Sequence, residues 1–315
     1  MIAPASCEHT NYKKDGKNRN GTQRYKCKDC GVRFSDEKPL GTMRTSVDKA
    51  AMAISLMLEA MSVRATERLT GLCRQTICDL ILVAGEKCQN FFDATVINVK
   101  SLDIQCDEIW SFCGMKQKQA VAREAGPDMG DSWTYIAVDR DTKMILAHHV
   151  GKRDVTDTDE FLMKLACAVD QSNRIQVSTD GWHGYQYGVP FALGRNIDFG
   201  MLIKKYAASQ TETRYSPATI IAAEKVPVFG NPDEDKICTS HIESLNQKIR
   251  MHLKRFCRLT AAHSKSIDHH IAMQNIFFCW YNFCRKHSTI GTTPAIAAGV
   301  AKRTLSLQMI LEAAQ

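Results

Sequence analysis

Three acidic residues stand at points of the sequence where their carboxylates could share metal ions. Asp107 comes at the end of a segment from about residue 97 in which apolar and polar residues alternate, and Asp180 follows a predicted strand at residues 175–178. Glu243 lies in a later segment whose apolar residues recur at helical spacing. Carboxylates in such places could hold two divalent cations about 3.5 to 4 Å apart, as phosphodiester chemistry requires. Their hard oxygens favour two Mg²⁺ ions, or Mn²⁺.

The two aspartates also have simpler interpretations. The pair Asp180-Gly181 is a common turn dipeptide. Asp107 could lie on the solvent-facing side of a half-buried strand. Trp182, two residues after Asp180, is expected to be a core side chain, with base stacking as the alternative. Neither aspartate decides the function when it is taken alone.

The helix predicted around Glu243 is strongly basic after that residue. Residues 244–258 contain five Lys or Arg and no acid. Arg250 follows Glu243 by about two turns on the same face, and Lys254 lies a further turn along. A face with charges of one sign can follow the phosphates of DNA, although a solvated surface has the same composition.

Hydrophobic patterns predict the elements that must position these side chains. They indicate strands ending at Asp107, at 133–138, 144–150, 175–178 and 199–206, and helices at 157–169 and from residue 240. Residues 211–235, with three prolines, are expected to be irregular. The order β-β-β-α-β-β-α predicts an α/β (α+β) fold in which helices flank a mixed sheet.

The first part of the chain has a different character. Residues 1–40 contain few aliphatic side chains but hold Cys7, His9, Cys27 and Cys30, and the Cys-x-x-Cys spacing is typical of a zinc knuckle. Helical periodicity then predicts helices at 54–61 and 63–69 and from Arg74. The turn at Thr70-Gly71 makes this segment similar to a helix-turn-helix.

Composition limits the class of protein. The 315 residues are 44% hydrophobic and 24% charged, which is typical of a globular chain with a substantial core. We find no long apolar run and no signal peptide, and therefore expect a cytoplasmic, nucleoid-associated protein without a membrane partner. The thirteen cysteines are expected to be reduced. The net charge of +7 suits a polyanionic partner.

Five sequence blocks give the chain a specific resemblance. They lie at residues 106–112 (CDEIWSF), 179–182 (TDGW), 241–256, 281–285 (YNFCR) and 293–295 (TPA). Over residues 100–300 the chain resembles the transposases of the insertion-sequence-one family, which carry a DDE triad in a ribonuclease-H-like domain. Residues 21–31 and the helix-turn-helix segment resemble the DNA-binding half of the same family.

The resemblance implies a function and assigns roles to residues. It implies that Asp107, Asp180 and Glu243 are the catalytic metal ligands of a DNA transposase, which binds the terminal inverted repeats of its element, cleaves DNA and joins it to a target. The partners would be the double-stranded DNA of the repeats and the target, and a second copy of the chain in a homodimer or larger assembly. The expected DNA contacts are Arg74, Gln75, Thr76, Arg250, Lys254 and Arg255.

The predicted division of the chain follows from the same resemblance. It comprises a zinc-ribbon-like segment at 1–40, a helix-turn-helix at 45–92, a catalytic domain at 98–300 and a C-terminal tail at 301–315. Relatives have a second Cys-x-x-Cys, whereas this chain has Thr10 three positions after Cys7. We expect His9 to complete a Zn²⁺ site with Cys7, Cys27 and Cys30, the alternative being a ribbon held by packing.

Two other functions compete with the transposase. A decayed transposase could keep DNA binding and act as a repressor, and a nuclease of the same fold could cut DNA without joining it. The intact triad argues against the first, and the ribbon with its helix-turn-helix argues against the second.

Overall fold

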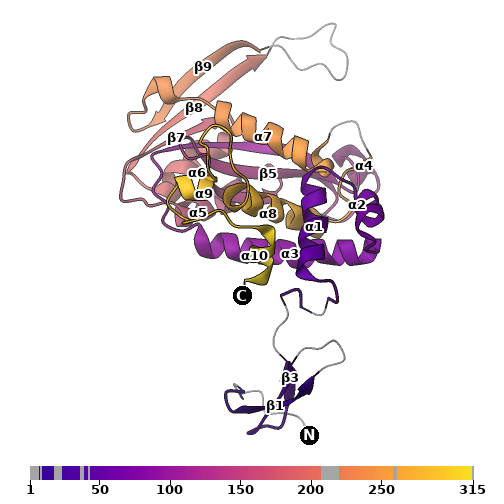
Figure 1. The fold of residues 1–315 in the computed structure, drawn as a ribbon. Helices are drawn as coiled ribbons and strands as arrows, with labels where there is room; N and C mark the ends of the chain where they lie inside the picture. The colour runs from indigo at the N-terminus through magenta and orange to yellow at the C-terminus, as the bar shows by residue number, and fades with distance from the viewer. Residues whose placement is uncertain are drawn as a thin grey trace. The chain divides into compact units, whose positions relative to one another are not determined.

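The computed structural model describes residues 7, 9–17, 23–35, 39–41, 43–206, 220–257 and 261–313 (Figure 1). The chain divides into two compact units, residues 1–45 and residues 46–313. Each unit has its own sheet, and each is described by itself.

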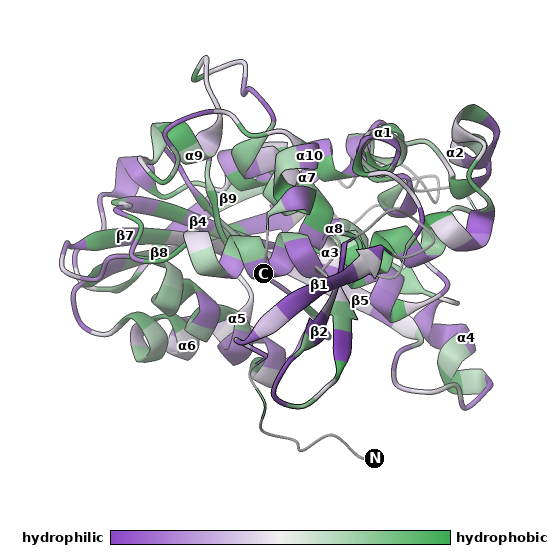
Figure 2. Cartoon of the chain, turned by 60° about the horizontal axis from the view of Figure 1, so that its bottom comes forward, coloured by the Kyte–Doolittle hydropathy of each residue, from purple (hydrophilic) through white to green (hydrophobic). Residues whose placement is uncertain are grey.

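The first unit is a three-stranded antiparallel sheet with the order β1-β2-β3. Its strands are β1 (Tyr12–Lys17), β2 (Gln23–Cys27) and β3 (Arg33–Ser35). Tyr12, Tyr25 and Phe34, one from each strand, pack together with ring centroids 5.1 to 5.7 Å apart. Figure 2 shows that β1 is hydrophilic along most of its length, so this aromatic cluster supplies the apolar contacts that the few aliphatic residues cannot.

The second unit is built on a six-stranded mixed sheet with the order β6-β5-β4-β7-β8-β9. The strands are β4 (Asp103–Cys113), β5 (Gly130–Asp139), β6 (Ile145–Gly151), β7 (Ile175–Asp180), β8 (Ile197–Tyr206) and β9 (Ile220–Phe229). β4, β7 and β8 run parallel, and the other neighbouring pairs are antiparallel. This sheet with its flanking helices confirms the predicted fold class.

Two strand predictions were wrong in detail. β4 does not end at Asp107 but continues to Cys113, because its second half pairs with β5 in a long antiparallel ladder. β9 lies within residues 211–235, which the sequence analysis expected to be irregular. β9 is an exposed strand at the edge of the sheet, so no alternation of buried and exposed side chains marks it, and Pro227 is tolerated there.

Helices cover both faces of this sheet. The main helices are α1 (Val47–Leu58), α2 (Val63–Thr70), α3 (Arg74–Thr95), α5 (Val155–Ala168), α6 (His183–Leu193), α7 (Ser240–His252) and α8 (Ile267–Phe283). Short helices are α4 (Gln117–Ala122), α9 (Pro294–Ala297) and α10 (Leu307–Glu312), and residues Glu234–Lys236 and Lys254–Phe256 form single 3₁₀ turns. α7 lies on β4 and β5, and α5 and α6 pack together on the opposite face.

The three helices predicted at residues 54–84 are present as α1, α2 and α3. Ser46 and Ser62 cap α1 and α2 by accepting hydrogen bonds from backbone N–H groups, and Gly71 ends α2 in the left-handed conformation at φ +68°. α3 is long and packs along α8, where a Cβ atom at Gly85 would lie 2.5 Å from the Cβ of Ala272. These helices therefore belong to the same compact unit as the sheet, and their separate role in DNA binding stays a prediction.

α8 is the most buried long helix in the part of the chain that the structure describes. Twelve of its seventeen residues are buried, and these include the polar side chains of His270, Gln274, Asn275 and Asn282. None of the described helices combines the length and the hydrophobicity needed to cross a bilayer.

Candidate active site

Strand register brings Asp107 and Asp180 side by side. β4 and β7 are parallel, and Cys106 pairs with Thr179. Asp107 and Asp180, the next residues of the two strands, are therefore neighbours. β7 ends at Asp180, whose Oδ1 accepts a hydrogen bond of 2.9 Å from the backbone N–H of Trp182. Asp180 therefore stabilises the turn, as one interpretation of the sequence expected, and it also lies beside Asp107.

α7 is fixed over β4 by a polar side chain of the sheet. The Oε1 atom of Gln105 accepts hydrogen bonds from the backbone N–H groups of His241 and Ile242, at 3.0 and 3.2 Å. These N–H groups belong to the first turn of the helix, which has no partners within the helix for them. Asn246, farther along α7, donates to Asp107 at 2.9 Å. The helix that carries Glu243 is thus held on the same face of β4 as Asp107.

Glu243 faces the same cavity as the two aspartates. This cavity of about 600 Å³ is lined by Asp107, Asp180 and Glu243 together with Arg153, Trp182 and Lys204. The Glu243 carboxylate accepts hydrogen bonds from the Lys204 ammonium and from Thr239 Oγ1, the latter at 2.6 Å. The structure therefore gathers all three predicted acids around one cavity, with Glu243 paired to a lysine of β8.

A fourth acid, Glu108, joins the aspartates. Oxygens of Asp107, Glu108 and Asp180 all lie within 4.8 Å of one another, and this cluster of described residues does not include Glu243. The side chain of Glu108 is 1% exposed. The sequence analysis missed Glu108 as a site residue, although it directly follows Asp107, because alternation along a strand sends its side chain to the opposite face.

Arg153 compensates this crowded charge. Its guanidinium lies 3.2 Å from a carboxylate oxygen of Glu108 and 3.2 Å from one of Asp180. It is also held between two indole rings, 4.9 Å from the Trp133 centroid and 4.6 Å from that of Trp182. Trp182 thus stacks on a cation of the site, a role that the sequence analysis did not consider, and Arg153 lies just before α5 where no sequence pattern marked it.

Burial and mutual repulsion shift the titration of the acids. Burial, followed by the negative charge of Asp180, raises the pKa of Asp107 to about 7. Burial and the same neighbour raise the pKa of Glu108 to about 8. Carboxylates this close favour a bound cation, and oxygen ligands suit Mg²⁺ or Mn²⁺. The chemistry of the Asp107 and Asp180 side chains therefore fits a hard divalent metal, and their role as its ligands stays a prediction.

The predicted Cys and His ligands converge in the first unit. Ligand atoms of Cys7, His9, Cys27 and Cys30 all lie within 4.8 Å of one another. The Cys7 and Cys27 sulfurs are 3.7 Å apart, and the Cys30 sulfur is 3.3 Å from His9 Nδ1. Zn–S bonds of about 2.3 Å in a tetrahedron place two sulfurs roughly 3.8 Å apart, so the separations fit zinc.

Local backbone geometry explains how the short Cys-x-His spacing is accommodated. His9 has φ +52°, in the left-handed region, and this turns its ring toward the Cys-x-x-Cys loop. Hydrogen bonds lower the pKa of Cys27 to about 6. The largest effect comes from the backbone N–H of Cys30, followed by the His9 side chain. A thiol that ionises readily is a good metal ligand.

The predicted DNA contacts differ in their surroundings. Arg250 is half-buried on α7, and Lys254 is exposed just after it. Arg255 donates to the backbone carbonyl of His269 and to Ser264 Oγ, the latter at 3.2 Å, so its guanidinium already has partners inside the protein. Contacts of all three with DNA stay predictions.

At the start of α3, Arg74 and Gln75 are exposed, Thr76 is half-buried, and each has a partner nearby in the protein. Arg74 lies 3.2 Å from Glu67, Gln75 donates to Asp79 at 2.8 Å, and Thr76 Oγ1 lies 3.0 Å from the sulfur of Cys73. Their role in binding DNA stays a prediction.

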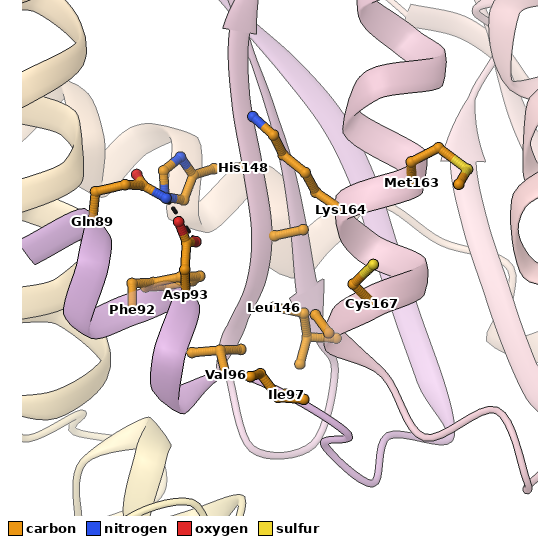
Figure 3. A pocket seen from close by; sticks show the side chains of 12 residues that line it. Gln89, Phe92, Asp93, Val96, Ile97, Leu146, His148, Met163, Lys164 and Cys167 are labelled. Carbon is orange, nitrogen blue, oxygen red and sulfur yellow. Dashed lines mark hydrogen bonds between the residues drawn. The ribbon is translucent and has the colours of Figure 1, made fainter. Parts of the chain in front are cut away.

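A second cavity, of about 420 Å³, lies between α3, β6 and α5 (Figure 3). Its wall is mainly hydrophobic, and the Gln89 amide donates to Asp93 at its rim, at 2.7 Å. His148 packs edge-on against Phe92 and at a tilt against Phe278, at centroid separations of 5.1 and 4.4 Å. The ring of His148 is buried in the core.

No protein-family model and no curated protein matches this chain. Among solved structures, a cryo-EM structure of a piggyBac transposase synaptic complex with hairpin DNA is similar at 10% identity, over 86% of this chain and 72% of that chain, with a TM-score of 0.38. The crystal structure of the Mos1 strand transfer complex is similar at 12% identity, over 52% of this chain and 60% of that chain, with a TM-score of 0.22. Both TM-scores are below 0.5, so the function must be argued from the site itself.

Proposed function

We propose that this protein is a DNA transposase of the DDE type, a Mg²⁺-dependent polynucleotidyl transferase that binds the terminal inverted repeats of an insertion element. The observation that carries the proposal is the register of β4 and β7, which places Asp107 beside Asp180 with Glu243 across the same cavity. The resemblance of the sequence to insertion-sequence-one transposases supports the same assignment. A homodimer or larger assembly follows, because two element ends must be held together.

The residues of the chain divide the work of the site. Asp107, Asp180 and Glu243 would hold two divalent cations, which, when bound, supply positive charge to the attacking and leaving oxygens of a phosphodiester. Asn246 orients the Asp107 carboxylate, and the N–H of Trp182 orients that of Asp180. Each fixed carboxylate is thereby ready for a metal without rearrangement of its strand.

In the absence of metal, two basic side chains of the protein neutralise these acids. Lys204 holds Glu243, and Arg153 bridges Asp180 and Glu108. Glu108, buried behind the strand, is a positioning residue for Arg153. In this scheme Lys204 must release Glu243 before that carboxylate can complete the metal site.

DNA binding would come from the N-terminal part of the chain. Cys7, His9, Cys27 and Cys30 would hold one Zn²⁺ that stabilises the ribbon. The ribbon and the helix-turn-helix would then contact the terminal repeats, with Arg74, Gln75 and Thr76 at the start of the recognition helix. Arg250 lies on the flank of α7 that bears Glu243, and Lys254 lies just after the end of α7. Both residues would contact DNA near the reacting phosphate.

The direct test uses purified full-length protein, a labelled duplex with the element end and a target plasmid, in Mg²⁺ or in EDTA. Asp180→Asn is compared with Asp128→Asn, which changes an exposed aspartate outside the site. We expect Mg²⁺-dependent cleavage and joining by the wild type and by Asp128→Asn, and neither by Asp180→Asn. Cleavage without joining would indicate a nuclease, and binding without a metal effect would indicate a DNA-binding relic.

A further inference from the structure

α7 presents two different flanks. Its core side, which includes Ile242 and Ile249, is buried on the sheet. At about 100° per residue, Glu243 and Arg250 lie on one flank of that side. By the same geometry His241 and Lys248 lie on the other flank, which the proposed chemistry does not use.

The second flank is the centre of a cluster of basic side chains. This group of basic side chains, which we call the flank cluster, consists of Lys143, His241, Lys248, Arg285 and His287. The ammonium of Lys143 is 3.3 Å from His241 Nδ1, and that of Lys248 is 2.8 Å from His287 Nε2. The members come from the turn before β6, from α7 and from the segment after α8. The fold therefore assembles this cluster from three distant parts of the sequence.

The charges of the cluster are poorly balanced. The charged groups that act on Lys248 are Arg285 and Lys143, and those that act on His287 are Lys248, Arg285 and Lys143, all of one sign. Carboxylates act on Lys143, from Asp141, Asp139 and Asp103, and on His241, from Asp141, while Arg140 adds a positive charge beside both.

The pKa values of these basic groups reflect the excess of positive charge. Burial and neighbouring positive charges lower the pKa of Lys248, and they lower that of His287 to about 4. Cations crowded in this way are relieved when an anion binds between them.

We propose that the flank cluster binds phosphates of duplex DNA on the side of α7 opposite to Glu243. The proposal rests on the proposed DNA-binding function and adds a contact surface to it. An α-helix with its side chains is about 10 to 12 Å wide, which is close to the width of about 12 Å of a DNA major groove. A duplex that lies across α7 can therefore meet Arg250 on one flank and Lys248 on the other.

DNA is the occupant that the surroundings favour. The basic run of residues 244–258 continues from Lys248 past Arg250 to Lys254 without an acid, so the cluster is continuous with the flank nearest the carboxylates. Lys143, Lys248 and Arg285 are each partly exposed. Basic side chains that follow one another along a surface can each contact one of the regularly spaced phosphates of DNA.

The test is the salt dependence of DNA binding by the full-length chain. A fluorescein-labelled duplex of about 30 base pairs is titrated with protein in EDTA at several NaCl concentrations, so that binding is measured without cleavage. Each phosphate contact contributes about 0.9 to the slope of log Kd against log [NaCl]. We expect the double variant Lys248→Gln, Arg285→Gln to lower this slope by about 1.8 and to bind at least about tenfold more weakly at 0.1 M NaCl.

Two matched variants separate a contact from a structural effect. Lys248→Arg, Arg285→Lys retains both charges and should keep the wild-type slope. Lys118→Gln, Arg123→Gln removes two exposed charges in and beside α4, away from α7, and should also keep it. Thermal unfolding of all variants verifies that they fold, and relief of repulsion should leave the melting temperature of the Gln variant unchanged or higher.

The outcomes distinguish this proposal from the proposed function. An unchanged slope in the Gln variant would overturn the flank cluster as a DNA contact, while the transposase would stand if Asp180→Asn alone abolishes cleavage and joining. Equal loss of slope in the α4 variant would show a general charge effect and would also overturn it. A reduced slope together with no metal-dependent cleavage would support the contact and contradict the transposase.

Discussion

The two predicted metal clusters of this protein are built in opposite ways. Cys7, His9, Cys27 and Cys30 come together within one small three-stranded sheet, and their spacings already match those of a tetrahedral zinc site. The carboxylate site depends on two strands and a helix whose acids, Asp107, Asp180 and Glu243, lie far apart in the sequence. Cationic side chains of the protein, Arg153 and Lys204, hold two of these acids in place. We therefore expect the first cluster to depend on its metal more strongly than the second, whose acids already have cationic partners within the fold.

The ribbon should show the larger dependence on its metal. We expect the wild-type chain to retain about one equivalent of zinc, and Cys27→Ser to retain none, because structural zinc supplies much of the folding free energy of such small units. Elemental analysis after gel filtration measures the zinc, and proteolysis measures the order of residues 7–45. Zinc retained in full by Cys27→Ser would contradict the ligand set, and Cys167→Ser, at an exposed cysteine of α5, is the matched control.

The carboxylate site should instead lose stability when its internal cation is removed. Arg153→Met leaves Glu108 and Asp180 without their partner and should lower the free energy of unfolding by about 2 kcal/mol, less than a fully buried pair because Arg153 is partly exposed. Urea denaturation in EDTA measures this loss. The double variant Arg153→Met, Glu108→Gln should lose less than Arg153→Met alone. An equal or larger loss in the double variant would show that Glu108 and Arg153 are not coupled.

The pH dependence of stability should have the opposite sign to that of ordinary ion-paired acids. The pKa values of Asp107 and Glu108, about 7 and about 8, lie above those of unfolded acids, so the folded protein binds more protons than the unfolded chain in this range. Stability without metal should therefore fall as pH rises from about 5 to about 8. Urea titrations should show a shallower fall for Glu108→Gln than for Glu86→Gln, which changes an exposed acid of α3. Equal slopes would rule out the buried protonated acid.

The smallest effect is expected at the position where this ribbon differs from the family pattern. Thr10→Cys restores the usual spacing of the first knuckle, but His9 already lies at the ligand position. The zinc content should stay at about one equivalent, and competition with a chelator should change the zinc affinity by less than about tenfold. A much larger gain would show that His9 is not a ligand in the native chain.

Sequence patterns predicted the elements that have strong periodicity. The strands around Asp107 and Asp180 and the helix with Glu243 were expected, because alternation and helical spacing mark them. α6 was missed because glycines and Pro190 interrupt its pattern, and such residues are poor helix formers. β9 was missed because an exposed edge strand has no alternation of burial.

The site shows the same division between local signals and tertiary contacts. The set of Cys and His ligands could be predicted because Cys-x-x-Cys is a local signal. Glu108 and Arg153 could not, because their contact depends on the packing of α5 and α6 on the face of β4 opposite to Asp107. The pairing of Glu243 with Lys204 likewise depends on β8, which lies beside the aspartates only in the folded sheet.

The most direct test of the central claim is the number of Mn²⁺ ions that the full-length chain binds, measured by electron paramagnetic resonance of free Mn²⁺ after the zinc site is filled. We predict two sites at pH 8 in the wild type and in Asp128→Asn, and loss of tight binding in Asp107→Asn and Asp180→Asn. Glu243→Gln should lose one of the two ions. Equal Mn²⁺ binding by all five proteins would contradict a metal centre formed by β4, β7 and α7.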